Sequence, residues 1–226
     1  MSWAGVLWPT FTLLPRLAAG AQPQSGMHRW ASRLLPALGV ELELRGQLRS
    51  DLPLWVANHL SWVDAVVLMS LRPMGTIAKG EVTGYPLIGG WAKRSGLHFV
   101  DRENPASRAS ALAAFTGSLR AGRPMLLFPE GTTTRGETLA PFYEGGLRAA
   151  HALGLPAQPT RISSPAHHYP WIGDETLLPH LRILLATRTP VVVEALEPLH
   201  PADHPDPADW IAAFRSALAP RSPHAC

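Results

Sequence analysis

Runs of apolar residues divide the chain into segments that alternate between the strand and the helix pattern. Residues 40–44 alternate apolar and acidic side chains, the period of two of a half-buried strand. The apolar run 52–57 has strand length and is bounded by polar residues, and a buried strand is predicted at 123–128. Further strands are predicted at 76–79, 96–102, 155–162 and 189–195, and helices from 61 to about 70 and at 107–120, 145–153 and 209–218. This alternation predicts an α/β fold with a largely parallel central sheet flanked by helices.

A polar stretch, Asn58-His59-Leu60-Ser61-Trp62-Val63-Asp64, joins the strand at 52–57 to the helix that follows. On one straight helix, residues five apart diverge by about 140°, so His59 and Asp64 would not meet. They meet if Ser61 is the N-cap and Asp64 the third helical residue, a capping-box arrangement with Asp in place of Glu. A carboxylate on one ring nitrogen fixes the tautomer of His59 and raises the basicity of the other nitrogen. The stretch therefore predicts a general base.

The spacing alone proves little, because His204 and Asp209 repeat it inside His-Pro-Asp-Pro-Ala-Asp. The prolines and the lack of apolar flanks make that second pair a loop. We interpret the second pair as accidental, so the hypothesis for His59 depends on its position between a strand and a helix.

The N-terminal region is apolar and amphipathic. Residues 3–17 are rich in Trp and Leu but are interrupted by prolines and are shorter than the roughly 20 residues that span a bilayer. An apolar stripe at helical spacing follows and should end near Leu35, before Pro36; it consists of Met27, Trp30, Ala31, Leu34, Leu35 and Leu38. Such a helix either docks on the core or lies in the membrane interface. We favour the interface, which predicts membrane-associating helices over 1–39 and the α/β domain over 40–226.

The composition is that of a protein with a real core: 46% of residues are hydrophobic and only 16% are charged. The formal net charge of +3 is carried mostly by Arg and fits an anionic partner such as a membrane surface, a phosphorylated substrate or an acidic carrier protein. No nucleic-acid motif is visible, and we expect no nucleic-acid partner. The single cysteine, Cys226, excludes a disulfide framework.

Polar loops follow three of the predicted strands, and each also has an ordinary structural interpretation. They are Asn58-His59, Asp101-Arg102 and Glu130-Gly131-Thr132. In a parallel sheet, loops at the carboxyl ends of the strands make the site. Together they supply a base, a guanidinium suited to phosphate, and a Gly-containing turn with hydroxyls and backbone donors. Such a set of groups could bind a phosphate-bearing alcohol and activate its hydroxyl.

The motifs that contain these loops, taken in order, resemble the four blocks of the glycerolipid acyltransferase family, in particular bacterial 1-acylglycerol-3-phosphate acyltransferases. They are Asn58-His59-x-x-x-x-Asp64, Gly96-x-x-Phe99-x-x-Arg102, Phe128-Pro129-Glu130-Gly131-Thr132 and Leu155-Pro156-x-x-Pro159, and the likeness covers roughly residues 40–200. The resemblance implies that His59 is the catalytic base and Asp64 its partner, with Arg102 on the acceptor phosphate. It also places these residues in substrate binding: Glu130, Gly131, Thr132, Lys79, Asn58 and Ser61.

The implied reaction is acyl transfer from an acyl thioester, either acyl-coenzyme A or an acyl carrier protein, to the hydroxyl of a lysolipid. The expected acceptor is 1-acylglycerol-3-phosphate, which would give phosphatidic acid. Residues 171–180 resemble a proteobacterial subset that includes lyso-ornithine-lipid acyltransferases, which makes a lyso-ornithine lipid the alternative acceptor. We expect no metal and no cofactor, and backbone oxyanion donors near His59 or Gly131. No stretch of 18 apolar residues occurs, which predicts a peripheral or monotopic protein, expected on the cytoplasmic face of the inner membrane.

Two other classes of function remain open. A metal-dependent hydrolase could use His59, His98, His167 and His168 with nearby carboxylates, although no metal-ligand spacing is visible. A non-catalytic lipid-binding protein would explain the amphipathic N-terminus, and the intact pair of His59 and Asp64 argues against it.

Overall fold

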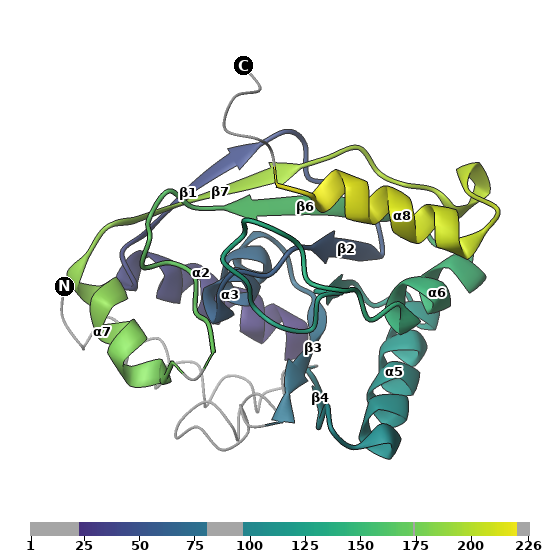
Figure 1. Ribbon diagram of the computed structural model, residues 1–226, viewed down its shortest axis with the longest axis horizontal. Coiled ribbons are helices and arrows are strands. Elements are labelled where there is room, and N and C mark those ends of the chain that lie inside the picture. The colour runs from purple at the N-terminus through teal and green to yellow at the C-terminus, as the bar shows by residue number, and fades with distance from the viewer. Residues whose placement is uncertain (1–22, 81–96, 174, 221–226) are drawn as a thin grey trace.

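The computed structural model describes residues 23–80, 97–173 and 175–220, and these ranges build one seven-stranded sheet (Figure 1). The strand order is β1-β7-β6-β2-β5-β3-β4. The strands are β1 (Val40–Arg45), β2 (Leu54–Ala57), β3 (Gly75–Lys79), β4 (His98–Val100), β5 (Met125–Leu127), β6 (Ala157–Ser163) and β7 (Thr189–Ala195). All neighbours pair in parallel except β6 and β7, which are antiparallel. The predicted, largely parallel sheet is confirmed, and β6, β2, β5, β3 and β4 run in one direction.

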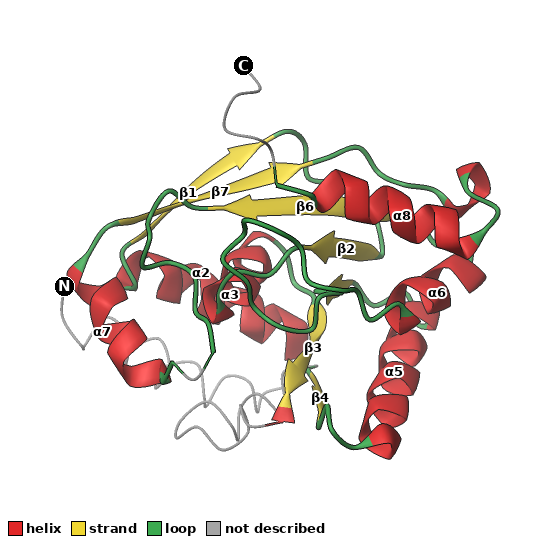
Figure 2. Ribbon diagram, viewed as in Figure 1, coloured by secondary structure: helices red, strands yellow, loops and turns green. Residues whose placement is uncertain are grey.

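Helices cover both faces of this sheet, so the molecule has three layers (Figure 2). One hydrophobic core lies under α2 (Pro23–Ala37), α3 (Trp62–Leu71) and α7 (Leu177–Ala186), and the other lies under α5 (Pro105–Arg120), α6 (Gly145–Ala152) and α8 (Pro207–Leu218). A short 3-10 turn, Pro201–Asp203, precedes α8. The sequence did not predict α7.

Strand β2 lies in the middle of the sheet because its apolar run can be buried on both faces. Trp55 and Ala57 point into the core under α2 and α3, and Leu54 and Val56 point into the core under α5, α6 and α8. All four side chains are buried. The strand therefore holds its carboxyl end, where Asn58 and His59 follow, at a fixed central place.

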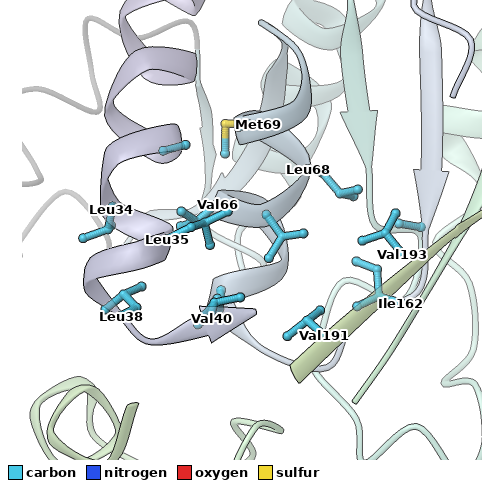
Figure 3. Close-up of a cluster of buried hydrophobic side chains, with 14 of the residues drawn as sticks. Leu34, Leu35, Leu38, Val40, Val66, Leu68, Met69, Ile162, Val191 and Val193 are labelled. Atoms are coloured by element: carbon cyan, nitrogen blue, oxygen red, sulfur yellow. The ribbon is translucent and has the colours of Figure 1, made fainter. Parts of the chain in front are cut away.

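Helix α2 packs directly on α3, and Figure 3 shows Leu35 beside Val66 and Leu38 near Val40. The apolar stripe for which we favoured membrane contact is thus buried inside the molecule, at 0–7% exposure. Burial against α3 and the sheet edge gives this stripe the same hydrophobic stabilisation that a membrane would. The helix also runs two residues past the predicted end, because a proline in the last turn removes only one hydrogen bond.

The Trp-rich residues 3–17, which carried part of the membrane expectation, lie outside the described residues. Residues 81–96, whose last residue, Gly96, begins the second family-like block, and Cys226 lie outside them as well. Within the described ranges, none of the helices combines the length and the apolar character needed to cross a bilayer.

Candidate active site

The turn between β2 and α3 is shaped by a capping box. Ser61 is the N-cap of α3 in an extended conformation; its hydroxyl accepts a hydrogen bond from the Val63 amide, while the Asp64 carboxylate accepts one from the Ser61 amide. This is the arrangement predicted from the sequence, and it is confirmed. It turns the Asp64 side chain back toward the residues that precede the helix.

His59 and Asp64 meet as a consequence. The Nδ1 atom of His59 lies 2.9 Å from Oδ2 of Asp64, whose side chain is fully buried, whereas the His59 side chain keeps 16% exposure. The ring of His59 stacks on Phe128 with centroids 4.0 Å apart and an interplanar angle of 16°. Because a carboxylate can only accept, Nδ1 carries the proton and Nε2 is left as the basic nitrogen.

Glu130 holds the backbone of this loop. Its Oε1 accepts from the His59 amide at 2.8 Å, and its Oε2 accepts from the Ala140 amide at 2.8 Å. Burial at 1% exposure raises the pKa of Glu130, and the two amide bonds oppose that rise. The resemblance implied a role for Glu130 in acceptor binding, but the structure turns both of its oxygens to the chain itself.

The turn after Glu130 lies against the same loop. The Thr134 amide donates to the His59 carbonyl at 2.9 Å, so both backbone groups of His59 are held by residues 130–134. Gly131 adopts φ +60°, where a Cβ would lie 2.7 Å from the Tyr143 ring, which explains the glycine. Thr132, expected in substrate binding, is exposed at this turn.

Arg102 and Lys79 lie along the same edge of the sheet as His59. Lys79 is the last residue of β3, and Arg102 follows β4. Since strands are spaced by about 4.8 Å, these positions stand roughly 10 Å and 14 Å from β2 along the edge. The structure therefore gathers the predicted cations on the edge that carries His59, without placing them against its ring.

Asn58 and Ser61, also expected in substrate binding, are tied into the fold. Asn58 is 5% exposed and exchanges two hydrogen bonds with the backbone of Ile162, at 2.7 and 2.9 Å, which clips β2 to β6. Ser61 is fully buried as the cap of α3. Both residues position His59 from either side.

Sequence reasoning missed the loop after β6. The hydroxyl of Tyr169 donates to Oδ1 of Asp64 at 2.5 Å, and the Trp171 amide donates to the Leu60 carbonyl at 2.8 Å. Thr133 in turn donates its hydroxyl to the Trp171 carbonyl. No local pattern marks Tyr169, since it follows two histidines in a polar stretch and lies 105 residues from Asp64.

The histidines named for a metal site do not gather in one place. His98 bonds the hydroxyl of Ser118 at 3.0 Å, His168 bonds that of Thr189 at 2.9 Å, and His167 is exposed. In the ranges that the structure describes, no three His, Cys, Asp or Glu side chains gather as metal ligands.

A cavity of about 340 Å³ opens between the loop after β6 and α7. Its lining carries both charges, with Arg135 and Glu175, beside the polar His167 and Thr176 and the apolar Ile172 and Ile183.

Comparison with known proteins gives consistent matches. The sequence profile of the Acyltransferase family matches residues 42–163. A lyso-ornithine lipid O-acyltransferase from Pseudomonas aeruginosa is 39% identical over 176 residues, which cover 75% of this chain and 68% of the relative. A 1-acyl-sn-glycerol-3-phosphate acyltransferase from Salmonella typhimurium is 30% identical over 141 residues, 60% of this chain and 58% of the relative.

Among solved structures, the 1-acyl-sn-glycerophosphate acyltransferase PlsC from Thermotoga maritima shares the fold, with a TM-score of 0.68 at 18% identity. The match covers 94% of this chain and 88% of that one. His59, Asp64, Arg102 and Glu130 lie inside the residues matched by the family profile, and Tyr169 lies beyond them.

Proposed function

The chain belongs to the Acyltransferase family, and we propose that it moves a fatty acyl group from an acyl thioester to the hydroxyl of a lyso-ornithine lipid. The observation that carries this proposal is the contact between His59 and a fully buried Asp64, which leaves Nε2 of His59 as a base at the edge of the sheet. The identity of the family makes the reaction an O-acyl transfer. The acceptor, the donor and the roles of the residues are our proposal.

The chemistry needs one base and no acyl-enzyme intermediate. Nε2 of His59 takes the proton of the acceptor hydroxyl as its oxygen attacks the thioester carbonyl. The tetrahedral intermediate collapses to the ester, and the departing sulfur takes the proton from the imidazolium to leave as a thiol. Asp64 stabilises the imidazolium in between. General base catalysis of this kind contributes about 10²- to 10⁴-fold, and holding both substrates in register adds to it.

We place the oxyanion donors in the turn after Gly131. The amides of His59, Leu60 and Ser61 already donate to Glu130 and Asp64. By contrast, the amides of Thr132 and Thr133 donate to no acceptor within the described part of the chain. We therefore propose that these two amides donate hydrogen bonds to the thioester oxygen as its negative charge develops.

Two observations support a lyso-ornithine lipid as acceptor. The relative from Pseudomonas aeruginosa, at 39% identity, carries that name. The cavity beside the loop after β6 presents Arg135 and Glu175, whose opposite charges suit a zwitterionic head group with one carboxylate and one ammonium group. A phosphate head group would not use the carboxylate of Glu175.

A second candidate acceptor is 1-acylglycerol-3-phosphate, the one expected from the sequence. The relative from Salmonella typhimurium carries that activity in its name. Arg102 and Lys79 supply two cations at the edge that carries His59, and a guanidinium suits phosphate. We keep this acceptor as the second arm of the experiment below.

The donor and the location follow from charge and substrate. A formal charge of +3 favours an anionic donor, which both acyl-coenzyme A and an acyl carrier protein provide. A lysolipid acceptor resides in a bilayer, so we propose that the protein works as a peripheral or monotopic enzyme on the cytoplasmic face of the inner membrane.

The test is a thiol-release assay with the purified full-length chain in detergent. Acyl-coenzyme A and acyl carrier protein are each paired with lyso-ornithine lipid and with lysophosphatidate, and His59→Ala provides the control without a base. We expect turnover with lyso-ornithine lipid, and we expect His59→Ala to abolish it. Turnover with lysophosphatidate alone would reassign the acceptor, and Arg102→Ala should then raise its KM. Thiol release from no pair would favour the non-catalytic lipid-binding protein.

A further inference from the structure

The Asp64 carboxylate is held through both of its oxygens. Oδ2 accepts from the amides of Leu60 and Ser61, at 2.6 and 2.8 Å, and from Nδ1 of His59 at 2.9 Å. Oδ1 accepts from the hydroxyl of Tyr169 at 2.5 Å. The side chains of Asp64 and Tyr169 both have 0% exposure, so bulk water cannot take the place of the tyrosine hydroxyl. Rotation of the carboxylate would leave buried polar atoms without partners, which costs free energy.

The loop that delivers Tyr169 is itself anchored on both sides of this residue. After it, the Trp171 amide donates to the Leu60 carbonyl at 2.8 Å. Before it, the ring of His168 bonds the hydroxyl of Thr189 at 2.9 Å. These two hydrogen bonds therefore fix the position of the Tyr169 hydroxyl, as the capping box fixes that of the Asp64 carboxylate.

Helix α7 braces the same loop through His180. The Trp62 indole donates to Nδ1 of His180 at 3.0 Å, and Nε2 of His180 donates to the His168 carbonyl at 3.0 Å. This pair of bonds requires the neutral ring, and burial lowers the pKa of His180 accordingly. Trp62 is the first residue of α3, so the brace runs from the helix of Asp64 to the neighbour of Tyr169.

The hydroxyl of Tyr169 can only be a donor here. Burial, and then the charge of Asp64, raise the pKa of Tyr169 well above its ordinary value, so the phenol stays protonated. Its hydrogen bond draws part of the carboxylate charge toward Oδ1 and away from His59. Apart from Asp64, the ionisable group that contacts His59 in the described residues is Glu130, on the amide side of the residue.

We propose that Tyr169 is a positioning residue of the active site, completing a chain of three side chains from Tyr169 through Asp64 to His59. It fixes the carboxylate that orients His59 and limits how strongly that carboxylate holds the proton that His59 takes from the acceptor. The proposal rests on the proposed function for its kinetic consequences and on the observed bonds for its geometry. Tyr169 touches neither substrate, because its side chain is fully buried.

Tyr169→Phe removes this bond and keeps the packing of the ring. The variant and its parent are assayed in the full-length chain between pH 5.5 and 9 with whichever donor and acceptor the parent uses. We expect kcat to fall about tenfold, because a carboxylate that has lost this bond no longer holds His59 in one orientation, and this loss outweighs the gain of charge beside the imidazolium. The acceptor KM should stay within about twofold, because the buried side chain of Tyr169 does not touch the acceptor. The acidic limb of the kcat profile should move to higher pH by about half a unit, because the full carboxylate charge then holds the proton on His59.

Thr76→Val is the matched control. It also removes one buried hydroxyl bond, from Thr76 to the Leu126 carbonyl at 2.9 Å, but in strand β3 and without contact to Asp64. This control should leave the acidic limb in place even if it lowers the melting temperature as much as Tyr169→Phe. An equal loss of kcat in both variants, or an acidic limb that stays in place or moves to lower pH in Tyr169→Phe, overturns the proposal.

A titration of the histidine rings by NMR gives a readout that needs no turnover. The His59 signal is assigned by its disappearance in His59→Gln, and its midpoint is compared between the parent and Tyr169→Phe. A higher midpoint in Tyr169→Phe supports the proposal even if the parent transfers no acyl group from any donor, which would count against the proposed function alone. An unchanged or lower midpoint overturns the role of Tyr169 while the function stands.

Discussion

Asp64→Asn tests what the charge of this residue contributes, because His59 can keep its geometry in the variant. The amide oxygen can occupy the position of Oδ2, where it still accepts from Leu60, Ser61 and Nδ1 of His59. The new NH₂ group then faces the hydroxyl of Tyr169, which can turn and accept. His59 therefore keeps its tautomer and its orientation, and the variant loses the negative charge together with the hydrogen bond that Tyr169 donates.

The magnitude follows from the distance. Nδ1 of His59 and Oδ2 of Asp64 are 2.9 Å apart, which places the centres of the two charges about 4 Å from each other. At an effective dielectric constant of about 20, the attraction in the imidazolium state is about 4 kcal/mol. The neutral ground state lacks this term, so its loss raises the barrier, and every 1.4 kcal/mol is a factor of about ten. We expect kcat to fall about 10³-fold.

The assay is thiol release under saturating donor, with kcat and the acceptor KM measured for the parent, Asp64→Asn and His59→Ala. The acceptor KM should stay unchanged in Asp64→Asn, because the side chain is fully buried and does not reach the acceptor. The thermal unfolding midpoint serves as the control for an intact fold. A kcat within tenfold of the parent would refute the argument, since the charge of Asp64 would then play little part in stabilising the imidazolium.

Three further outcomes follow from the same structure. Glu130→Gln should lower the free energy of unfolding by about 1–3 kcal/mol and remove most of kcat, because the new NH₂ group, a donor, would face the donor amide of His59 or of Ala140. Thermal unfolding and the thiol-release assay measure the two effects, and unchanged values would contradict the prediction. Gly131→Ala should cost about 1–2 kcal/mol at φ +60° and disturb turnover, whereas Gly154→Ala, at φ +66° with open space around it, should share the strain and keep kcat. Burial lowers the pKa of His180, so below about pH 6.5 the unfolded chain binds a proton at this histidine more readily than the folded chain does. The thermal unfolding midpoint should therefore fall as the pH is lowered from about 7.5 to about 5.5, and it should fall less steeply in His180→Gln.

Local patterns predicted the parts of this structure whose causes are local. Alternation at 40–44 and the apolar run of β2 predicted strands because a pleat or a doubly buried strand imposes that pattern. The capping box at Ser61 predicted the meeting of His59 and Asp64, because all of its atoms belong to one turn.

Contacts between distant segments could not be predicted in this way. The sequence shows that Glu130 follows a strand, but it does not show that its partners are the amides of His59 and Ala140, since an amide carries no residue-specific signal. Tyr169 reaches Asp64 only once the loop after β6 has folded over α3. The stripe of α2 predicted an apolar face correctly, but the pattern is the same whether a membrane or α3 covers it.

Helix α7 was missed for a local reason. Thr176 is an N-cap residue type, but Pro179 stands at the third helical position, where a capping box would have Glu or Gln, so the start signal is weak. A proline is tolerated there because the first turn of a helix has amides without helical partners.

The position of β1 has a consequence for how the protein is made. Strand β1 lies at one edge of the sheet, and its neighbour is β7, with Val40 opposite Thr189. A ribosome that has just released β1 must therefore add about 150 more residues before that strand finds its partner. Until then the edge strand is unpaired, which is the state in which nascent chains meet chaperones or aggregate. Chains stalled before β7 should thus be the most aggregation-prone products of translation, and chains stalled after it should already be protease-resistant.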